Sequence, residues 1–190
     1  MLEIKNLSKE FPVEKGIFTK SSLSVKAVQD VSFSINKNQV LGLVGESGSG
    51  KSTLGKTIMK LLNPTRGQII FNNENITNYK NWQMMKIRKE LQMIFQDPFA
   101  SLNPRKNIYE TLAEPVKVHK LIDKKDIKEY ITNILNDVGL SKQSLSRYPH
   151  EFSGGQRQRI GIARSLVLKP QFIIADEPVS ALDVSIQAQV

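Results

Sequence analysis

A glycine-rich loop between an apolar run and a helical stretch constrains the fold of this chain more than any other feature. The apolar run 40–44 is predicted to be a buried strand, and a helix is expected from Thr53 to Leu62. A strand, a glycine-rich loop and a helix in this order form a phosphate-binding loop, because backbone amides at the start of the helix point at the anion. The sequence therefore predicts an α/β core that binds a nucleotide.

The residues of this loop have chemically distinct expected roles. Glycines at positions 45, 48 and 50 should allow positive φ and a close approach of the backbone to a polyphosphate. Lys51 should reach the β- and γ-phosphates of ATP, and the Ser52 hydroxyl should bind Mg²⁺. The predicted ATP-binding residues are Gly45, Glu46, Ser47, Gly48, Ser49, Gly50, Lys51, Ser52 and Thr53. A glycine-rich turn with an incidental lysine is the alternative, and the flanking strand and helix disfavour it.

Length and composition restrict the class of protein. A chain of 190 residues with 39% hydrophobic content can bury one core and a small subdomain. No apolar run approaches the ~18 residues of a membrane span, and residues 1–5 alternate in character, unlike the core of a signal peptide. We therefore expect the chain to stay in the cytoplasm. The absence of cysteine excludes disulfides, thiolate catalysis and cysteine metal sites.

The net charge of +9 raises the question of a nucleic-acid partner. The basic residues are spread along the chain, without a block of like charge and without the interleaved aromatic residues that stack on bases. We interpret the excess as solvated surface and expect no nucleic-acid partner. A mild attraction to anionic lipid or to nucleotide stays open.

Hydrophobic periodicity outlines the remaining elements. Alternation or short apolar runs predict strands, and a 3.6-residue period predicts helices. Strands are expected at 2–7, 27–36, 68–71, 91–95 and 172–175, the last of them buried, and helical segments at 82–90, 108–136 and from Ser153 to about residue 167. Gly139 is a plausible C-cap, and His119 and His150 are expected on the surface or at caps. The pattern predicts antiparallel strands beside an α/β core with an inserted helical subdomain.

Polar side chains follow two of the predicted strands. Gln96 comes directly after the strand at 91–95, and Asp176 and Glu177 come after the strand at 172–175. Open α/β sheets bind ligands at the carboxyl ends of their strands. By themselves, two adjacent carboxylates are as compatible with helix caps or surface charge as with catalysis.

Taken together, five motifs resemble the ATP-binding subunits of ABC transporters, in order and in rough spacing. They are the phosphate loop, Gln96, the Ser153-Gly154-Gly155-Gln156 block, the strand ending in Asp176-Glu177, and the turn Ser180–Asp183. The resemblance covers nearly the whole chain. Residues 95–105, 147–152 and 175–185 are similar to the oligopeptide and dipeptide (peptide/nickel) importer branch, in particular to its second ATPase subunit.

This resemblance implies roles for individual residues. Phe11 would stack on adenine, and Gln96 would sense the γ-phosphate through Mg²⁺ or water. Asp176 would hold the Mg²⁺ shell, directly or through water, and Glu177 would orient or deprotonate the attacking water. The implied catalytic residues are Glu177, Gln96 and Lys51, and the implied Mg²⁺ residues are Ser52, Gln96 and Asp176.

Other implied residues act between subunits. Ser153, Gly154, Gly155 and Gln156 would close over the ATP bound to a partner subunit, and Asp183 would belong to the D-loop. The implied partners are a second ABC ATPase subunit, homologous or identical, two transmembrane permease subunits and, indirectly, an extracellular solute-binding protein. The chain would lie peripherally on the cytoplasmic side of the cell membrane and power import of oligopeptides or dipeptides.

The resemblance also implies an organisation for the chain. Residues 1–190 would form a partial ATP-binding domain, with a β subdomain and phosphate-loop core at 1–95, the Q-loop and helical subdomain at 96–155, and the signature helix, Walker B strand and D-loop at 156–190. The family continues with a further strand and a histidine, so we expect a fragment that ends at Val190. Two alternatives stay open: a nucleotide-binding module without turnover, and a soluble ABC-type ATPase.

Overall fold

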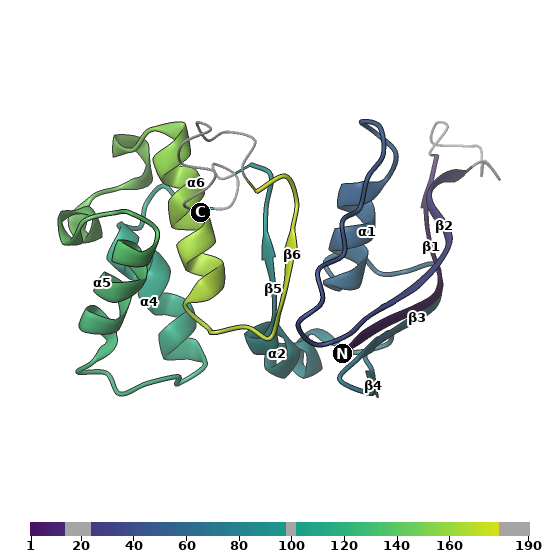
Figure 1. Cartoon of the computed structure of the whole chain (residues 1–190), viewed down its shortest axis with the longest axis horizontal. Coiled ribbons are helices and arrows are strands. Elements are labelled where there is room, and N and C mark those ends of the chain that lie inside the picture. Colours follow the sequence, from purple (N-terminus) through teal and green to yellow (C-terminus); the bar gives the residue numbers. More distant parts are fainter. Residues whose placement is uncertain (14–23, 98–101, 179–190) are drawn as a thin grey trace, which may run out of the picture. The chain divides into compact units, whose positions relative to one another are not determined.

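The computed structural model of the chain describes residues 1–13, 24–97 and 102–178. These residues belong to two compact units, one at 1–85 and the other from Lys86 onward, and Figure 1 labels their helices and strands. In the first unit the elements are β1 (Leu2–Pro12), β2 (Ser24–Ile35), α1 (Lys51–Ile58), β3 (Arg66–Phe71) and β4 (Glu74–Asn75). Helix α2 (Asn81–Glu90) crosses the boundary between the units.

The first unit is built on an antiparallel sheet with strand order β2-β1-β3-β4. Leu2 and Ile4 are buried at a two-residue spacing, and Leu7 resumes the buried face after a register shift. Asn6 makes this irregularity possible, because it takes a φ of 48°, which asparagine tolerates better than most residues. Helix α1 contacts β1 and β2 and contributes Leu54 and Ile58 to the core.

The second unit contains a two-stranded parallel sheet and a group of helices. Its elements are β5 (Leu91–Ile94), α4 (Ile108–Val118), α5 (Ile127–Asp137), the 3₁₀ turns η1 (Lys142–Ser146) and η2 (Pro149–Glu151), α6 (Gly154–Leu166) and β6 (Phe172–Ala175). Apolar side chains of α4, α5 and α6 form one core, including Leu112, Ile131 and Ile160, which are fully buried. Helix α6 also contacts β5.

Local sequence signals explain where these helices begin and end. Asn107 and Glu110 form a capping box at the start of α4. The Glu110 N–H donates to the Asn107 Oδ1 at 2.8 Å, and the Asn107 N–H donates to the Glu110 Oε2 at 3.0 Å. The C-cap of α5 is Val138, and Gly139, which was predicted to be the cap, is the next residue and has a φ of 71°. His119 caps the end of α4, where burial and then the charge of Lys89 lower its pKa.

Two predictions about buried strands are wrong. Residues 40–44 form no strand, and Val40 and Val44 are almost fully exposed. A strand needs a hydrogen-bonded neighbour, and in the described part of the first unit the sheet pairs only β1 to β4. Strand β6 is present, but only one of its faces is half-buried: Ile173 and Ala175 are exposed and alternate with the half-buried Phe172 and Ile174.

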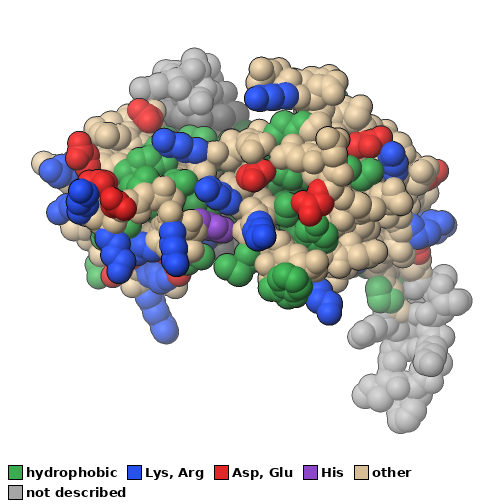
Figure 2. Space-filling view, turned by 90° about the horizontal axis from the view of Figure 1, so that it is seen from below, with side chains coloured by type: hydrophobic (Ala, Val, Ile, Leu, Met, Phe, Trp, Pro, Cys, Tyr) green, Lys and Arg blue, Asp and Glu red, His purple; other side chains and the backbone are tan. Residues whose placement is uncertain are grey.

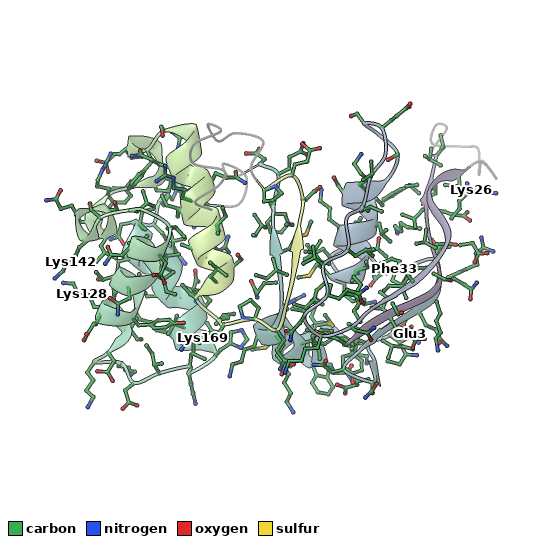
Figure 3. The ribbon with its side chains drawn as sticks, in the orientation of Figure 1. Glu3, Lys26, Phe33, Lys128, Lys142 and Lys169 are labelled. Atoms are coloured by element: carbon green, nitrogen blue, oxygen red, sulfur yellow. The ribbon has the colours of Figure 1, made fainter. Side chains whose placement is uncertain are left out.

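Both kinds of charged side chain are exposed on the face that Figure 2 shows, where lysine and arginine side chains lie among acidic ones. Lys128 and Lys142 are exposed and extend outward from α5 and η1 (Figure 3). None of the helices in the described ranges is both long enough and apolar enough to cross a membrane. The predicted division of the chain into three parts, with boundaries at residues 95 and 155, stays a prediction.

Candidate functional site

The phosphate loop leads directly into the first turn of α1. Within it, the backbone N–H of Ser49 donates to the carbonyl oxygen of Glu46 at 3.2 Å, and Gly50 caps the helix with φ of 95°. Leu54 then donates its N–H to the Gly50 carbonyl at 2.8 Å, which closes the first helical turn. The loop and the helix predicted from the sequence are therefore both present, although the helix spans Lys51–Ile58 and not Thr53 to Leu62.

The three glycines of the loop serve different purposes. Gly48 and Gly50 adopt positive φ, as expected, whereas Gly45 does not. At Gly45 the requirement is space, since a Cβ there would lie 2.8 Å from the Ser49 hydroxyl oxygen. At Gly50 both requirements apply, because a Cβ would lie 2.1 Å from the carbonyl oxygen of Ala27 in β2.

Gly50→Ala should lower the free energy of unfolding by at least about 2 kcal/mol, because the left-handed conformation alone costs an alanine about 1–2 kcal/mol. The contact with backbone atoms of Ala27 adds to that cost. Chemical denaturation measures the change. Gly42→Ala is the matched control, since no atom lies within 4 Å of a Cβ there. Equal stability of the two variants would contradict this account of the loop.

Lys51 reaches back over the loop that precedes it. Its Nζ donates to the carbonyl oxygens of Gly45 and Glu46, both at 2.7 Å, and lies 3.5 Å from the Ser49 hydroxyl oxygen. The ammonium charge is thereby fixed above the loop and beside the start of α1, where the helix dipole also favours an anion. This arrangement brings together Gly45, Glu46, Ser49, Gly50 and Lys51 of the predicted site.

The remaining residues predicted for this part of the site lie close by in sequence. Ser52 and Thr53 occupy the first turn of α1. A polyphosphate fits the loop because the ammonium of Lys51 and the amides at the helix start can donate hydrogen bonds to it. Oxygen donors of the type offered by the Ser52 hydroxyl and the Asp176 carboxylate suit Mg²⁺. In the described residues no group of three or more His, Asp or Glu side chains forms a metal cluster.

The second unit places three predicted residues at one edge of its parallel sheet. Strands β5 and β6 pair in register with Ile94 opposite Ala175, so their carboxyl ends coincide. There the Gln96 Nε2 donates to the Glu177 Oε2 at 2.7 Å. The Asp176 N–H donates to the Ile94 carbonyl oxygen at 3.0 Å. Gln96 therefore lies beside Asp176 and Glu177, although it is 80 or more residues away from them in the sequence.

Helix α6 begins with a reciprocal cap formed by two of the predicted residues. The Ser153 N–H donates to the Gln156 Oε1 at 3.0 Å, and the Gln156 N–H donates to the Ser153 Oγ at 3.3 Å. Gly154 and Gly155 are the first helical residues between them. Among the described residues outside this helix start, no atom lies within 4 Å of a Cβ built at Gly154, and Gly154 itself is exposed.

Phe11 and Asp183 are the remaining residues of the predicted site. Phe11 lies in β1 opposite Val25, is partly buried, and has the Lys9 Nζ 4.9 Å from its ring centroid. Its contact with adenine stays a prediction. Asp183 and the turn from Ser180 lie outside the described residues. The phosphate loop and Phe11 belong to the first unit, and Gln96, Ser153 and Glu177 belong to the second.

The sequence analysis missed one residue beside this site. Gln158 is 1% exposed within α6, and its Nε2 donates to the carbonyl oxygen of Pro178, the residue after Glu177, at 2.7 Å. A signal was available, because Gln158 stands four residues before the buried Ile162 on the same helical face. A polar residue on an apolar face marks a position where its hydrogen bonds matter.

Comparisons with known proteins agree with this geometry. A family model described as "ABC transporter" matches residues 28–180. The chain is 53% identical over 191 residues to the oligopeptide transport ATP-binding protein AppF of Bacillus subtilis, covering 100% of this chain and 58% of the relative. It is 54% identical over 191 residues to OppF of Streptococcus mutans, covering 100% of this chain and 60% of that protein. The chain thus spans about three fifths of the length of these relatives.

Solved structures have the same fold. A dimeric structure of the ATP-binding cassette MJ0796 in a post-hydrolysis state, bound to ADP and Pi, superposes with a TM-score of 0.88 at 27% identity. That match covers 100% of this chain and 79% of the other. The cbiO1 protein of Clostridium perfringens, part of the transporter complex cbiONQ, matches with a TM-score of 0.77 at 27% identity and covers 99% of this chain and 69% of the other.

Proposed function

The chain belongs to the ABC transporter family, and we propose that it is an ATP-binding and ATP-hydrolysing subunit that powers import of oligopeptides or dipeptides through a membrane transporter. The observation that carries the ATPase part is the phosphate loop, with the Lys51 ammonium fixed above it at the start of α1. The peptide part is supported by the similarity of this chain, over all of its residues, to about three fifths of two oligopeptide transport ATP-binding proteins.

In this proposal the chain binds ATP through the first unit. Lys51 transfers its hydrogen bonds from the loop carbonyls to the β- and γ-phosphate oxygens, and the amides at the start of α1 hold the same anion. Phe11 stacks on adenine. Ser52, Gln96 and Asp176 would hold Mg²⁺, which would supply charge neutralisation at the phosphates.

Hydrolysis in this proposal uses the residues at the β5 and β6 strand ends. Glu177 orients or deprotonates the attacking water, and Gln96 positions that carboxylate through the hydrogen bond between them. Ser153, Gly154, Gly155 and Gln156, at the start of α6, bind the γ-phosphate held by a partner ATPase. Asp183 belongs to the same interface. The partner ATPase is homologous or identical to this chain, and the MJ0796 cassette, which was solved as a dimer, supports such a pairing.

The assembled protein in this proposal lies peripherally on the cytoplasmic side of the membrane. Its partners are the second ATPase, two transmembrane permease subunits and, indirectly, an extracellular solute-binding protein. The three-part division of the chain at residues 95 and 155 belongs to the same proposal. Selectivity for the peptide resides in the permeases and the binding protein, so the chain itself recognises ATP.

The test is to purify the complex in detergent through a tag on this chain, identify its subunits by native mass spectrometry, and measure phosphate release from ATP. We expect two membrane-spanning subunits, a second ATPase and hydrolysis by the complex. Recovery without membrane-spanning subunits would contradict the transport role. An intact complex that binds ATP but releases no phosphate would overturn the ATPase role and leave a nucleotide-binding module.

A further inference from the structure

A buried glutamine connects helix α6 to the turn that carries Glu177. Gln158 is 1% exposed, and its Nε2 donates to the Pro178 carbonyl oxygen at 2.7 Å. Pro178 directly follows Glu177, so this bond is made to the backbone of the turn itself. The contact joins residues 20 positions apart in the chain, one in α6 and the other in the turn that follows β6.

Stability alone does not account for a glutamine at this position. Gln158 lies on the buried face of α6 together with Ile162 and Ser165. Within the described part of the chain its Oε1 has no hydrogen-bond partner, and a buried polar atom without one costs free energy. An apolar side chain of the same length would avoid this cost. The observed bond to Pro178 is the gain that the glutamine provides.

The turn that receives this bond is strained. Glu177 has a φ of 47°, in the left-handed region that a non-glycine residue seldom adopts. Such a conformation persists where the surrounding structure fixes it. On one side the Asp176 N–H donates to the Ile94 carbonyl oxygen at 3.0 Å, and on the other side Gln158 holds the Pro178 carbonyl. The backbone of Glu177 is thus anchored by a bond on each side.

We propose that Gln158 is a positioning residue for ATP hydrolysis, which fixes the backbone turn of Glu177 and so aims its carboxylate. The inference rests on the proposed ATPase function, since Glu177 is the residue through which Gln158 acts. Gln96 sets the end of the Glu177 side chain by its 2.7 Å bond, and Gln158 sets the backbone from which that side chain extends. Gln158 itself contacts neither ATP nor water in this proposal.

Gln158→Met tests the proposal in the complex purified through this chain. Methionine has a similar length and no hydrogen-bond donor, so the α6 face stays filled while the bond to Pro178 is lost. We expect kcat for ATP hydrolysis to fall about tenfold, with the KM for ATP and the melting temperature unchanged. Gln143→Met is the matched control, because Gln143 is exposed in η1, and it should leave all three values unchanged.

A second variant separates the hydrogen bond from the shape of the side chain. Gln158→His retains an N–H donor at a similar reach and should keep kcat within about threefold of the wild-type value. The proposal is overturned if the methionine variant keeps the wild-type kcat, or if methionine and histidine lower kcat equally. It is also overturned if KM and melting temperature change in step with kcat, as a structural role would require. A wild-type complex that hydrolyses no ATP would instead refute the proposed function.

Discussion

Glu177→Gln should lower kcat for ATP hydrolysis by about 100-fold or more while leaving the affinity for ATP within about threefold. A carboxylate that orients or deprotonates water contributes about 10²- to 10⁴-fold to such reactions, and a neutral amide lacks the basicity for that step. Because the phosphate loop is built from other residues, nucleotide binding should persist. Single-turnover hydrolysis and equilibrium titration with ATP measure the two effects separately.

Glu177→Gln tests the carboxylate specifically, because the substitution preserves the local geometry. Its oxygen can still accept the hydrogen bond that Gln96 donates to Glu177, so the substitution removes charge and basicity with little disturbance of the turn. Glu129→Gln is the control, since Glu129 is exposed on α5. A Glu177→Gln variant that hydrolyses ATP at the wild-type rate would remove Glu177 from the mechanism.

Lys51→Ala should weaken ATP binding by about 100-fold or more. Hydrogen bonds to a charged group contribute about 1.5–3 kcal/mol each, and Lys51 is expected to make them to two phosphates. The variant also removes the bonds from Nζ to the carbonyl oxygens of Gly45 and Glu46, so the loop loses the cation that organises it. Isothermal titration with ATP in the presence of Mg²⁺ measures the loss.

Lys56→Ala is the matched control for Lys51→Ala. It removes the same charge from α1, in the last turn of the helix and away from the loop. We expect its ATP affinity to stay within about threefold of the wild-type value. If Lys51→Ala bound ATP as tightly as the wild type, the assignment of residues 45–52 as a phosphate-binding loop would be refuted.

Patterns governed by neighbouring residues were predicted well. Alternation identified β1, the apolar run at 91–94 identified β5, and glycine at position 139 marked the end of α5. The positions of Gln96 and Glu177 after the ends of β5 and β6 followed from the apolar runs, whereas their meeting became known only from the pairing of the two strands. In these cases one periodicity or one backbone conformation determines the outcome.

Features that depend on distant partners were not predictable in the same way. The apolar composition of 40–44 and of β6 suggested burial, but burial depends on which strands pair with them. Similarly, Gln158 could be recognised as an unusual residue on α6, whereas its partner at Pro178 became known only from the fold. A hydrogen bond between two residues that are 20 positions apart produces no periodic pattern in the sequence.

The contacts of Lys51 have a consequence for which nucleotides the loop accepts. Its ammonium already has two carbonyl partners at 2.7 Å, so binding a nucleotide is an exchange of acceptors. A nucleoside or a monophosphate brings too little charge near Nζ to replace both carbonyls, while a di- or triphosphate offers several charged oxygens and stronger bonds. We therefore expect the loop to discriminate between nucleotides by phosphate chain length, because the phosphates compete with the loop's own carbonyl oxygens for Lys51.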